Sequence, residues 1–88
     1  MRPDTPIGEY RRRPDAGVLA AELHPIDAEE IGVWCGGELQ DDSSIALRTA
    51  HGRVICEVGD FVVRDVDGDF YPCSAAVFRR SYLPVTGG

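Results

Sequence analysis

The order of apolar and polar positions along the chain predicts several short strands and two short helices. Most apolar runs are short, rich in Val, Ile and Phe, and bounded by glycine turns, which is typical of antiparallel hairpins. The first run ends before Pro25 and predicts a strand or, alternatively, a helix. The predicted strands cover residues 18–23, 38–40, 45–49, 53–57, 61–64, 69–71 and 82–85.

Helix signals are clearest in the segment before the glycine pair Gly36-Gly37. Asp27 stands where an N-cap residue is favoured, and an acid follows three residues later, as in a capping box. The apolar spacing that follows, together with the glycine pair, predicts a helix over 28–35. Ile26 is expected to pack on Ile31 as a hydrophobic staple, and the helix is expected to bury its tryptophan against a sheet.

A second short helix is predicted over residues 75–80, because Ser74 is a favourable N-cap. Val77 and Phe78 are expected to face inward from it. The order of strand, helix, several strands, helix and strand is typical of an α+β domain. We therefore predict a single small α+β domain with a mostly antiparallel sheet of about five strands and two short helices.

The start of the chain differs from the rest in composition and in charge. Prolines and the run Arg11-Arg12-Arg13 predict a flexible basic tail over residues 1–15, followed by a compact domain over residues 16–88. Of the net charge of −6, the first fourteen residues carry +2 and the remainder carries −8. An acidic body disfavours binding to a phosphate backbone, so nucleic acid is not expected as a partner except through the arginine run.

Composition adds two further points. Lysine and asparagine are both absent, which indicates a GC-rich genome as the source. The chain has no apolar run long enough to cross a membrane, and its basic start lacks the apolar stretch of a signal peptide. We therefore expect a protein that acts inside the cell without a membrane partner.

Patterns that carry catalysis or metal binding are missing from the sequence. Cys35, Cys56 and Cys73 are odd in number and lack the C-x2-4-C spacing of a zinc site, so reduced thiols in apolar surroundings are expected. The run from Asp65 to Asp69 starts like a calcium loop but then departs from the EF-hand pattern, which favours a solvated hairpin turn. No catalytic residue, metal or cofactor is predicted, and the protein is not expected to be an enzyme.

Six residues are the candidates for contact with a ligand or partner. Aromatic side chains near a helix end and in a hairpin could line a small pocket or a partner-binding patch, the alternative being a place in the core. Arginines in or beside strands could hold a small anionic ligand, although arginines on strands often only face solvent. The candidates are Trp34, Phe70 and Tyr71 among the aromatics, and Arg48, Arg53 and Arg64 among the cations.

The second half of the chain resembles a family of small, uncharacterised proteins of tailed bacteriophages and prophages. The resemblance rests on Gly59-Asp60-Phe61, Val66, Gly68, Phe70-Tyr71-Pro72-Cys73, Phe78, Tyr82 and Pro84-Val85, which stand in the same register as the family motif. Val58, Asp65 and Ser74-Ala75 depart from it. The resemblance extends over about residues 17 to 85 and implies a phage origin, which agrees with a GC-rich host of actinobacterial type; it implies no catalytic residues.

The expected function is that of a small, non-enzymatic binding protein of a phage. It would modulate or inhibit a host factor in the host cytoplasm, in host takeover or anti-defence, by binding a host protein or a small anionic signalling ligand. An acidic, compact domain suits competition for a basic surface. The alternative is a minor structural or decoration protein of the virion, and homo-oligomerisation is compatible with either role because so small a domain gains stability from a shared face.

Overall fold

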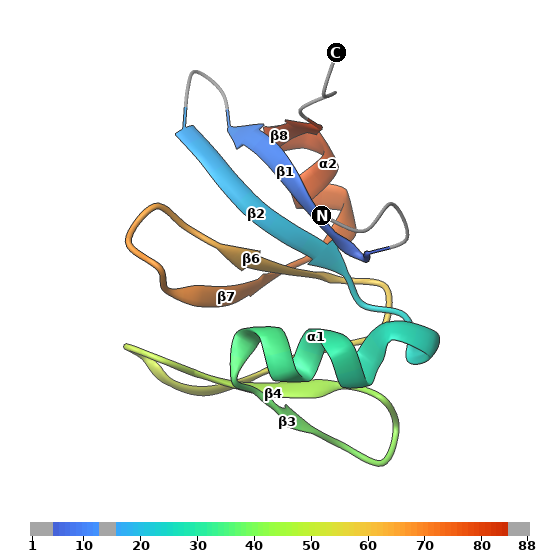
Figure 1. Ribbon diagram of the computed structural model, residues 1–88. Helices are drawn as coiled ribbons and strands as arrows, with labels where there is room; N and C mark the ends of the chain where they lie inside the picture. The colour runs from blue at the N-terminus through green and yellow to red at the C-terminus, as the bar shows by residue number, and fades with distance from the viewer. Residues whose placement is uncertain (1–4, 13–15, 85–88) are drawn as a thin grey trace.

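The computed structural model describes residues 5–12 and 16–84. This part contains eight β-strands, two α-helices and one 3-10 helix (Figure 1), so the predicted α+β class with two short helices is confirmed. In chain order the elements are β1 (Ile7–Arg12), β2 (Ala16–Glu22), the 3-10 helix η1 (Pro25–Asp27), α1 (Ala28–Cys35), β3 (Glu38–Leu39), β4 (Ile45–Thr49), β5 (Gly52–Cys56), β6 (Phe61–Arg64), β7 (Phe70–Cys73), α2 (Ala75–Ser81) and β8 (Tyr82–Pro84).

The strands form two antiparallel sheets. The larger has the order β7-β6-β2-β1-β8, and the smaller has the order β3-β4-β5. Both predicted hairpins are present as the pairs β4–β5 and β6–β7. The predicted antiparallel sheet of about five strands is present as the larger sheet. The structure adds a second sheet of three strands, because in the described part β3 and β5 pair with β4 and not with the larger sheet.

Strand β1 corrects the predicted boundary between tail and domain. β1 lies between β2 and β8, and its Tyr10 stands opposite Val18 on one side and Pro84 on the other. The Tyr10 ring also packs edge-to-face on Phe78, with 4.8 Å between ring centroids. The prediction of a flexible tail over the first fifteen residues is therefore wrong for β1, which is an inner strand of the larger sheet.

The larger sheet is packed on both faces. Neighbouring residues of a strand point to opposite faces, so Ala20 of β2 packs on the α2 side and Ala21 packs on the α1 side. In Figure 1, α2 lies behind β1, whereas α1 lies between the β2–β6 part of this sheet and strands β3 and β4. The α2-side core consists of Val18, Ala20, Phe61, Val63, Phe78 and Tyr82. The α1-side core consists of Ala21, Leu23, Ala28, Ile31, Cys35, Ile45, Leu47, Cys56 and Val62.

Helix α1 begins and ends where the sequence predicted. It covers Ala28–Cys35 and ends at Gly36, whose left-handed φ of 65° allows Gly37 to donate back to the Gly32 carbonyl. Asp27 occupies the N-cap position, but its side chain makes no capping hydrogen bond. The expected staple is wrong, because the Ile26 side chain is 91% exposed instead of packed on the helix.

Helix α2 is capped as predicted, because the Ser74 hydroxyl accepts a hydrogen bond from the Val77 amide at 3.3 Å. Of the two residues expected to face inward, Phe78 is buried, whereas Val77 is 47% exposed. The expectation for Val77 is therefore wrong: consecutive helix residues lie about 100° apart, so Phe78 points to the sheet and Val77 points away from its centre. Neither helix of the described part is long enough to cross a membrane.

Candidate functional site

The three aromatic candidates do not share one site. Trp34 packs edge-to-face on Phe70, with 5.0 Å between ring centroids, beside the α1-side core. Tyr71 follows Phe70 in β7 and therefore points to the opposite face of the sheet. There its hydroxyl shares a hydrogen bond of 3.0 Å with the Tyr82 hydroxyl. The proposed aromatic pocket is thus reduced to Trp34 and Phe70.

Tyr71 has a structural explanation. Burial, followed by the hydrogen bond to Tyr82, raises the pKa of Tyr71 well above the ordinary value of a tyrosine. A phenol that stays protonated and is already paired is a poor acid or base near neutral pH. Tyr71 therefore links β7 to β8 and offers no catalytic group.

Two of the three candidate arginines lie side by side. Arg48 of β4 stands directly opposite Arg53 of β5 in the smaller sheet, and both side chains are exposed. Together with Glu38 and the Gly36-Gly37 backbone they line a cavity of about 310 Å³. The Arg53 guanidinium lies 3.5 Å from the Glu38 carboxylate in a largely exposed ion pair. This cavity is the place in the described chain where a small anion could meet two arginines.

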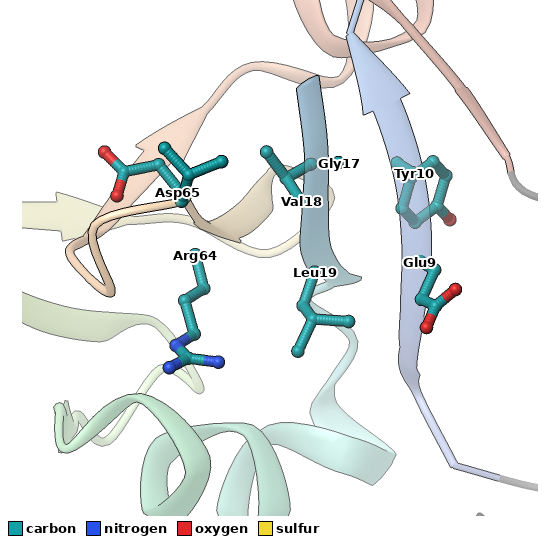
Figure 2. A pocket seen from close by; sticks show the side chains of 8 residues that line it. Glu9, Tyr10, Gly17, Val18, Leu19, Arg64 and Asp65 are labelled. Carbon is teal, nitrogen blue, oxygen red and sulfur yellow. The ribbon is translucent and has the colours of Figure 1, made fainter. Parts of the chain in front are cut away.

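Arg64 is separate from this pair. It lies in β6 opposite Leu19 of β2. With Glu9 and Asp65 it lines a cavity of about 460 Å³ on the larger sheet, where Figure 2 shows Arg64 and Asp65 pointing to opposite sides. The two carboxylates in the lining oppose the binding of an anion there. The structure therefore does not bring the three arginines together.

The arginine run at the start of the chain is described only in part. Arg11 lies in β1 with an exposed side chain, and Arg13 lies outside the described residues. A contact between this run and nucleic acid stays a prediction.

The acidic turn between β6 and β7 brings three carboxylates together. Ligand oxygens of Asp65, Asp67 and Asp69 all lie within 4.8 Å of one another, so among the described residues these three could hold a metal ion. The Asp65 carboxylate accepts hydrogen bonds from the Asp67 amide at 2.9 Å and from the Asp69 amide at 3.2 Å. These hydrogen bonds are typical of a turn closed by an aspartate side chain. The arrangement is accounted for by the hairpin itself.

The cysteines are free thiols in surroundings that suppress their reactivity. Cys35 and Cys56 are buried and Cys73 is half-buried. Burial raises the pKa of Cys56 to about 12, with a smaller contribution from the Asp60 carboxylate. Burial also raises the pKa of both Cys35 and Cys73. Because the thiolate is the nucleophile, these thiols are poorly suited to catalysis at neutral pH.

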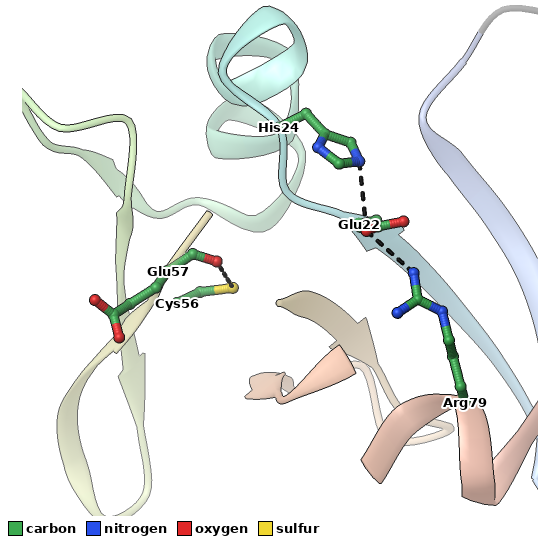
Figure 3. A network of polar contacts seen from close by, with 5 residues as sticks. All are labelled: Glu22, His24, Cys56, Glu57 and Arg79. Carbon is green, nitrogen blue, oxygen red and sulfur yellow. Dashed lines mark hydrogen bonds and ion pairs between the residues drawn. The ribbon is translucent and has the colours of Figure 1, made fainter. Parts of the chain in front are cut away.

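A polar network at the end of β2 has a structural role. The Glu22 carboxylate lies 3.5 Å from the His24 imidazole and 3.1 Å from the guanidinium of Arg79 in α2. Figure 3 shows Glu22 between these two side chains. The Arg79 guanidinium also lies 5.5 Å from the centroid of the Phe61 ring. These contacts hold α2 against the larger sheet. The Cys56 thiol, drawn in the same figure, donates to the Glu57 carbonyl at 3.9 Å.

The raised thiol pKa values predict that the protein loses stability in alkaline solution. Unfolded thiols ionise near pH 8.5, and the folded Cys56 thiol ionises at about 12. The contribution of Cys56 is therefore complete below about pH 8.5 and is lost as the pH rises towards 12, by at most about 1.4 kcal/mol per pH unit. Urea unfolding between about pH 8 and about pH 10.5 measures the slope. The variant Cys56→Ala should show a shallower slope, and an unchanged slope would contradict this origin.

The most exposed apolar side chains gather on the outer side of α1. Ile26 of η1 is 91% exposed, Val33 of α1 is 81% exposed, and both line the same depression. Two adjoining depressions, of about 550 and 310 Å³, share Glu29 and Val33 in their linings. We name this surface the α1 groove and define it by Ile26, Glu29, Val33, Trp34 and Leu39.

Sequence reasoning missed the α1 groove, although a signal for it was present. The buried positions of α1 are Ala28, Ile31, Gly32 and Cys35, which follow helical spacing and define the inward face. Val33 lies on the opposite face, where a solvated helix normally carries a polar residue. Ile26 was expected to be buried in a hydrophobic staple, so the two exposed apolar residues, Ile26 and Val33, were not recognised as one surface.

No family model, curated protein or solved structure matches the chain. What this molecule binds is therefore inferred from the surface chemistry of the described residues.

Proposed function

We propose that this chain is a small, non-enzymatic binding protein of a tailed phage, which occupies a host protein in the host cytoplasm and so modulates or inhibits it. The observation that carries the proposal is the α1 groove. Its apolar members Ile26, Val33 and Leu39 are 91%, 81% and 46% exposed. Exposed apolar side chains that form one patch with a polar rim are typical of protein–protein interfaces.

The groove has the shape of a docking surface on a stiff support. Trp34 forms part of its wall and is held by its contact with Phe70, so the wall is anchored in the α1-side core. Ile26 of η1 and Val33 of α1 line the same depression as this wall. A partner that covered them would remove apolar area from water without rearranging the core. Tryptophan is also one of the residues that contribute most to binding in protein interfaces.

The proposed phage origin rests on the sequence motif, and the motif residues explain the scaffold better than the surface. The Leu23 amide donates to the Asp60 carbonyl, and the Gly59 amide donates to the Leu23 carbonyl, each at 2.8 Å. Phe61, Phe78 and Tyr82 pack in the α2-side core. These motif residues form turns and core, so the residues that determine which partner binds are expected elsewhere, as in the α1 groove.

A small anionic ligand is the second candidate, supported by the cavity between Arg48 and Arg53. Two like charges directly opposite one another in a sheet repel, and an anion would relieve this repulsion. Glu38 already lies 3.5 Å from Arg53 and supplies part of that negative charge from within the chain. A protein partner at the α1 groove is therefore the better supported function.

A photo-crosslinking amino acid at position 33 tests the proposal. Expressed in the actinobacterial host, the variant should crosslink to one host protein. The same group at position 66 should not, because Val66 is 73% exposed but lies in the β6–β7 turn, away from the groove. The crosslinked protein is then purified and titrated against the wild type and against Val33→Asp.

The outcomes of this experiment separate the alternatives. A stoichiometric complex that forms with the wild type and is lost with Val33→Asp supports the proposal. Equal crosslinking from positions 33 and 66 would contradict a specific groove. Phage structural proteins as the crosslinked partners would favour the virion role instead.

A further inference from the structure

The charge around the α1 groove restricts the partner. Residues 25–47, which include α1 and β3, contain six acidic residues and no Arg, Lys or His, although one of the six, Glu38, lies 3.5 Å from the Arg53 guanidinium of β5. Among them Glu29 is exposed on α1 and borders both depressions of the groove. A partner that buries Ile26 and Val33 must approach this acidic segment closely. Positive charge on the partner is therefore favoured, because complementary charges both steer and orient an encounter.

The same charge argues against self-association through this surface. Two copies joined groove to groove would bring two identical acidic segments into contact, and like charges in an interface disfavour binding. A homodimer through the α1 groove is thus opposed by charge. The occupant is a different molecule that carries basic residues.

The shape of the groove favours a helix over a strand. A strand binds by pairing with a free sheet edge, and the edge strand at this groove, β3, has only two residues. Helix α1 uses its backbone groups within the helix and in the turn that ends it, where Gly36 donates to the Val33 carbonyl. An amphipathic helix needs only apolar anchors along a groove. Ile26 of η1, Val33 of α1 and Leu39 of β3 supply such anchors in the two adjoining depressions.

A glycine beside the anchors allows close approach. Gly36 is exposed and faces open space, since a Cβ added there would meet no atom within 4 Å. Without a side chain at this position, a helix could lie close to the end of α1 beside Val33. The eight residues of α1 extend about 12 Å, which is about two turns of a partner helix.

We propose that the α1 groove binds a basic amphipathic α-helix of a partner protein. The apolar stripe of that helix lies on Ile26, Val33 and Leu39, and its flanking Lys or Arg residues face Glu29. This inference rests on the proposed function, because it specifies the chemistry of the partner that occupies the same surface.

A designed peptide tests the inference without knowledge of the natural partner. The probe is a helical peptide of about 15 residues with leucines at i, i+3, i+4 and i+7 and lysines beside them. Its matched control carries glutamates in place of the lysines. Trp34 is the sole tryptophan of the chain and belongs to the groove, so its fluorescence reports binding directly. The lysine peptide should bind at least about tenfold more tightly than the glutamate peptide.

Two variants assign binding to the groove. Val33→Asp should abolish binding of the lysine peptide, whereas Val66→Asp, in the exposed β6–β7 turn, should leave it unchanged. Glu29→Lys should reverse the preference, so that the glutamate peptide now binds more tightly. Circular dichroism and thermal unfolding of each variant show that the fold is retained.

Several outcomes would contradict the binding of a basic helix. Equal binding of both peptides, or no binding of either, overturns the inference. Sedimentation that shows a dimer lost in Val33→Asp also overturns it, in favour of a second copy. If the peptides fail while the position-33 crosslink to a purified host protein persists, the proposed function stands and the helix is wrong. If both fail, the function fails as well.

Discussion

Replacing Phe78 with alanine is expected to lower the free energy of unfolding by about 3–5 kcal/mol. Phe78 is 1% exposed and fills the centre of the α2-side core. Its ring stacks on Phe61 with 4.0 Å between centroids and on Tyr82 with 4.6 Å, and it meets the edge of Tyr10 at 4.8 Å. Domains have a total stability of only roughly 5–15 kcal/mol, so the variant should be largely unfolded or close to it.

The neighbouring residue provides the control for this prediction. Val77 belongs to the same helix but is 47% exposed, so Val77→Ala should cost less than about 1 kcal/mol. Urea denaturation followed by Trp34 fluorescence measures both variants. Trp34 packs on the α1 side of the larger sheet, so its signal reports whether loss of the α2-side core unfolds the whole molecule. Similar stability of the two variants would contradict the central place of Phe78.

The two packed faces have different roles. The α2-side core contains the aromatic residues Phe61, Phe78 and Tyr82 and stabilises the sheet, whereas α1 covers the other face and presents the groove to solvent. A substitution such as Phe78→Ala should therefore reduce binding only by unfolding the protein. Val33→Asp should do the reverse, since an exposed side chain contributes little to folding. The comparison of these two variants separates stability from recognition.

Local signals in the sequence were sufficient for most of the elements. Helix α1 has the predicted bounds because the glycine pair at its end and the acid before its start are signals within a few residues. The β4–β5 hairpin is predicted for a similar reason, since Gly52, the first residue of β5 after the turn, has a positive φ of 107°. These elements depend on neighbours in the chain, which a single sequence displays.

Strand β1 could not be predicted in the same way. Its partners are β2 and the distant β8, so its pairing depends on contacts far apart in the sequence. Arginines and prolines around it suggested a tail, and the burial of Tyr10 against Phe78 becomes visible only in three dimensions. Pairing between distant strands is set by the whole fold rather than by local propensity.

The sequence likewise predicted some residues of the candidate site correctly and misplaced or missed others. Trp34 was predicted as a candidate from its size and its place near a helix end, and it does form part of the α1 groove. Tyr71 was grouped with it because of proximity in sequence to Phe70, but the alternation of β7 places Tyr71 on the other face. Val33 was overlooked, although the inward positions of α1 already implied that it faces outward.

At the junction between α1 and β3, a single added methyl group at Gly37 should strongly lower the free energy of unfolding. Gly37 has an ordinary backbone conformation, so alanine could adopt its dihedral angles without strain. Space is what is missing: an added Cβ would overlap Ile45 Cγ2 and would lie 3.0 Å from the Ala46 carbonyl oxygen and 3.1 Å from Cys35 Sγ. Because one of these neighbours is backbone, Gly37→Ala should force β4 away from α1, at a cost of about 3 kcal/mol.

The adjacent Gly36 is a matched control, because it has space for a Cβ but a backbone conformation that alanine disfavours. Gly36 has a left-handed φ of 65° and open space around its Cβ position, so Gly36→Ala should cost only about 1 kcal/mol of backbone strain. Urea denaturation should thus rank Gly37→Ala well below Gly36→Ala in stability, and the reverse order would contradict the close packing of α1 on β4. Gly37 lines the same depression as Val33 and Leu39, so the displacement of β4 should weaken binding of the lysine peptide even where the variant stays folded. A groove that retained full affinity in folded Gly37→Ala would show that Leu39 and β3 are not part of the docking surface.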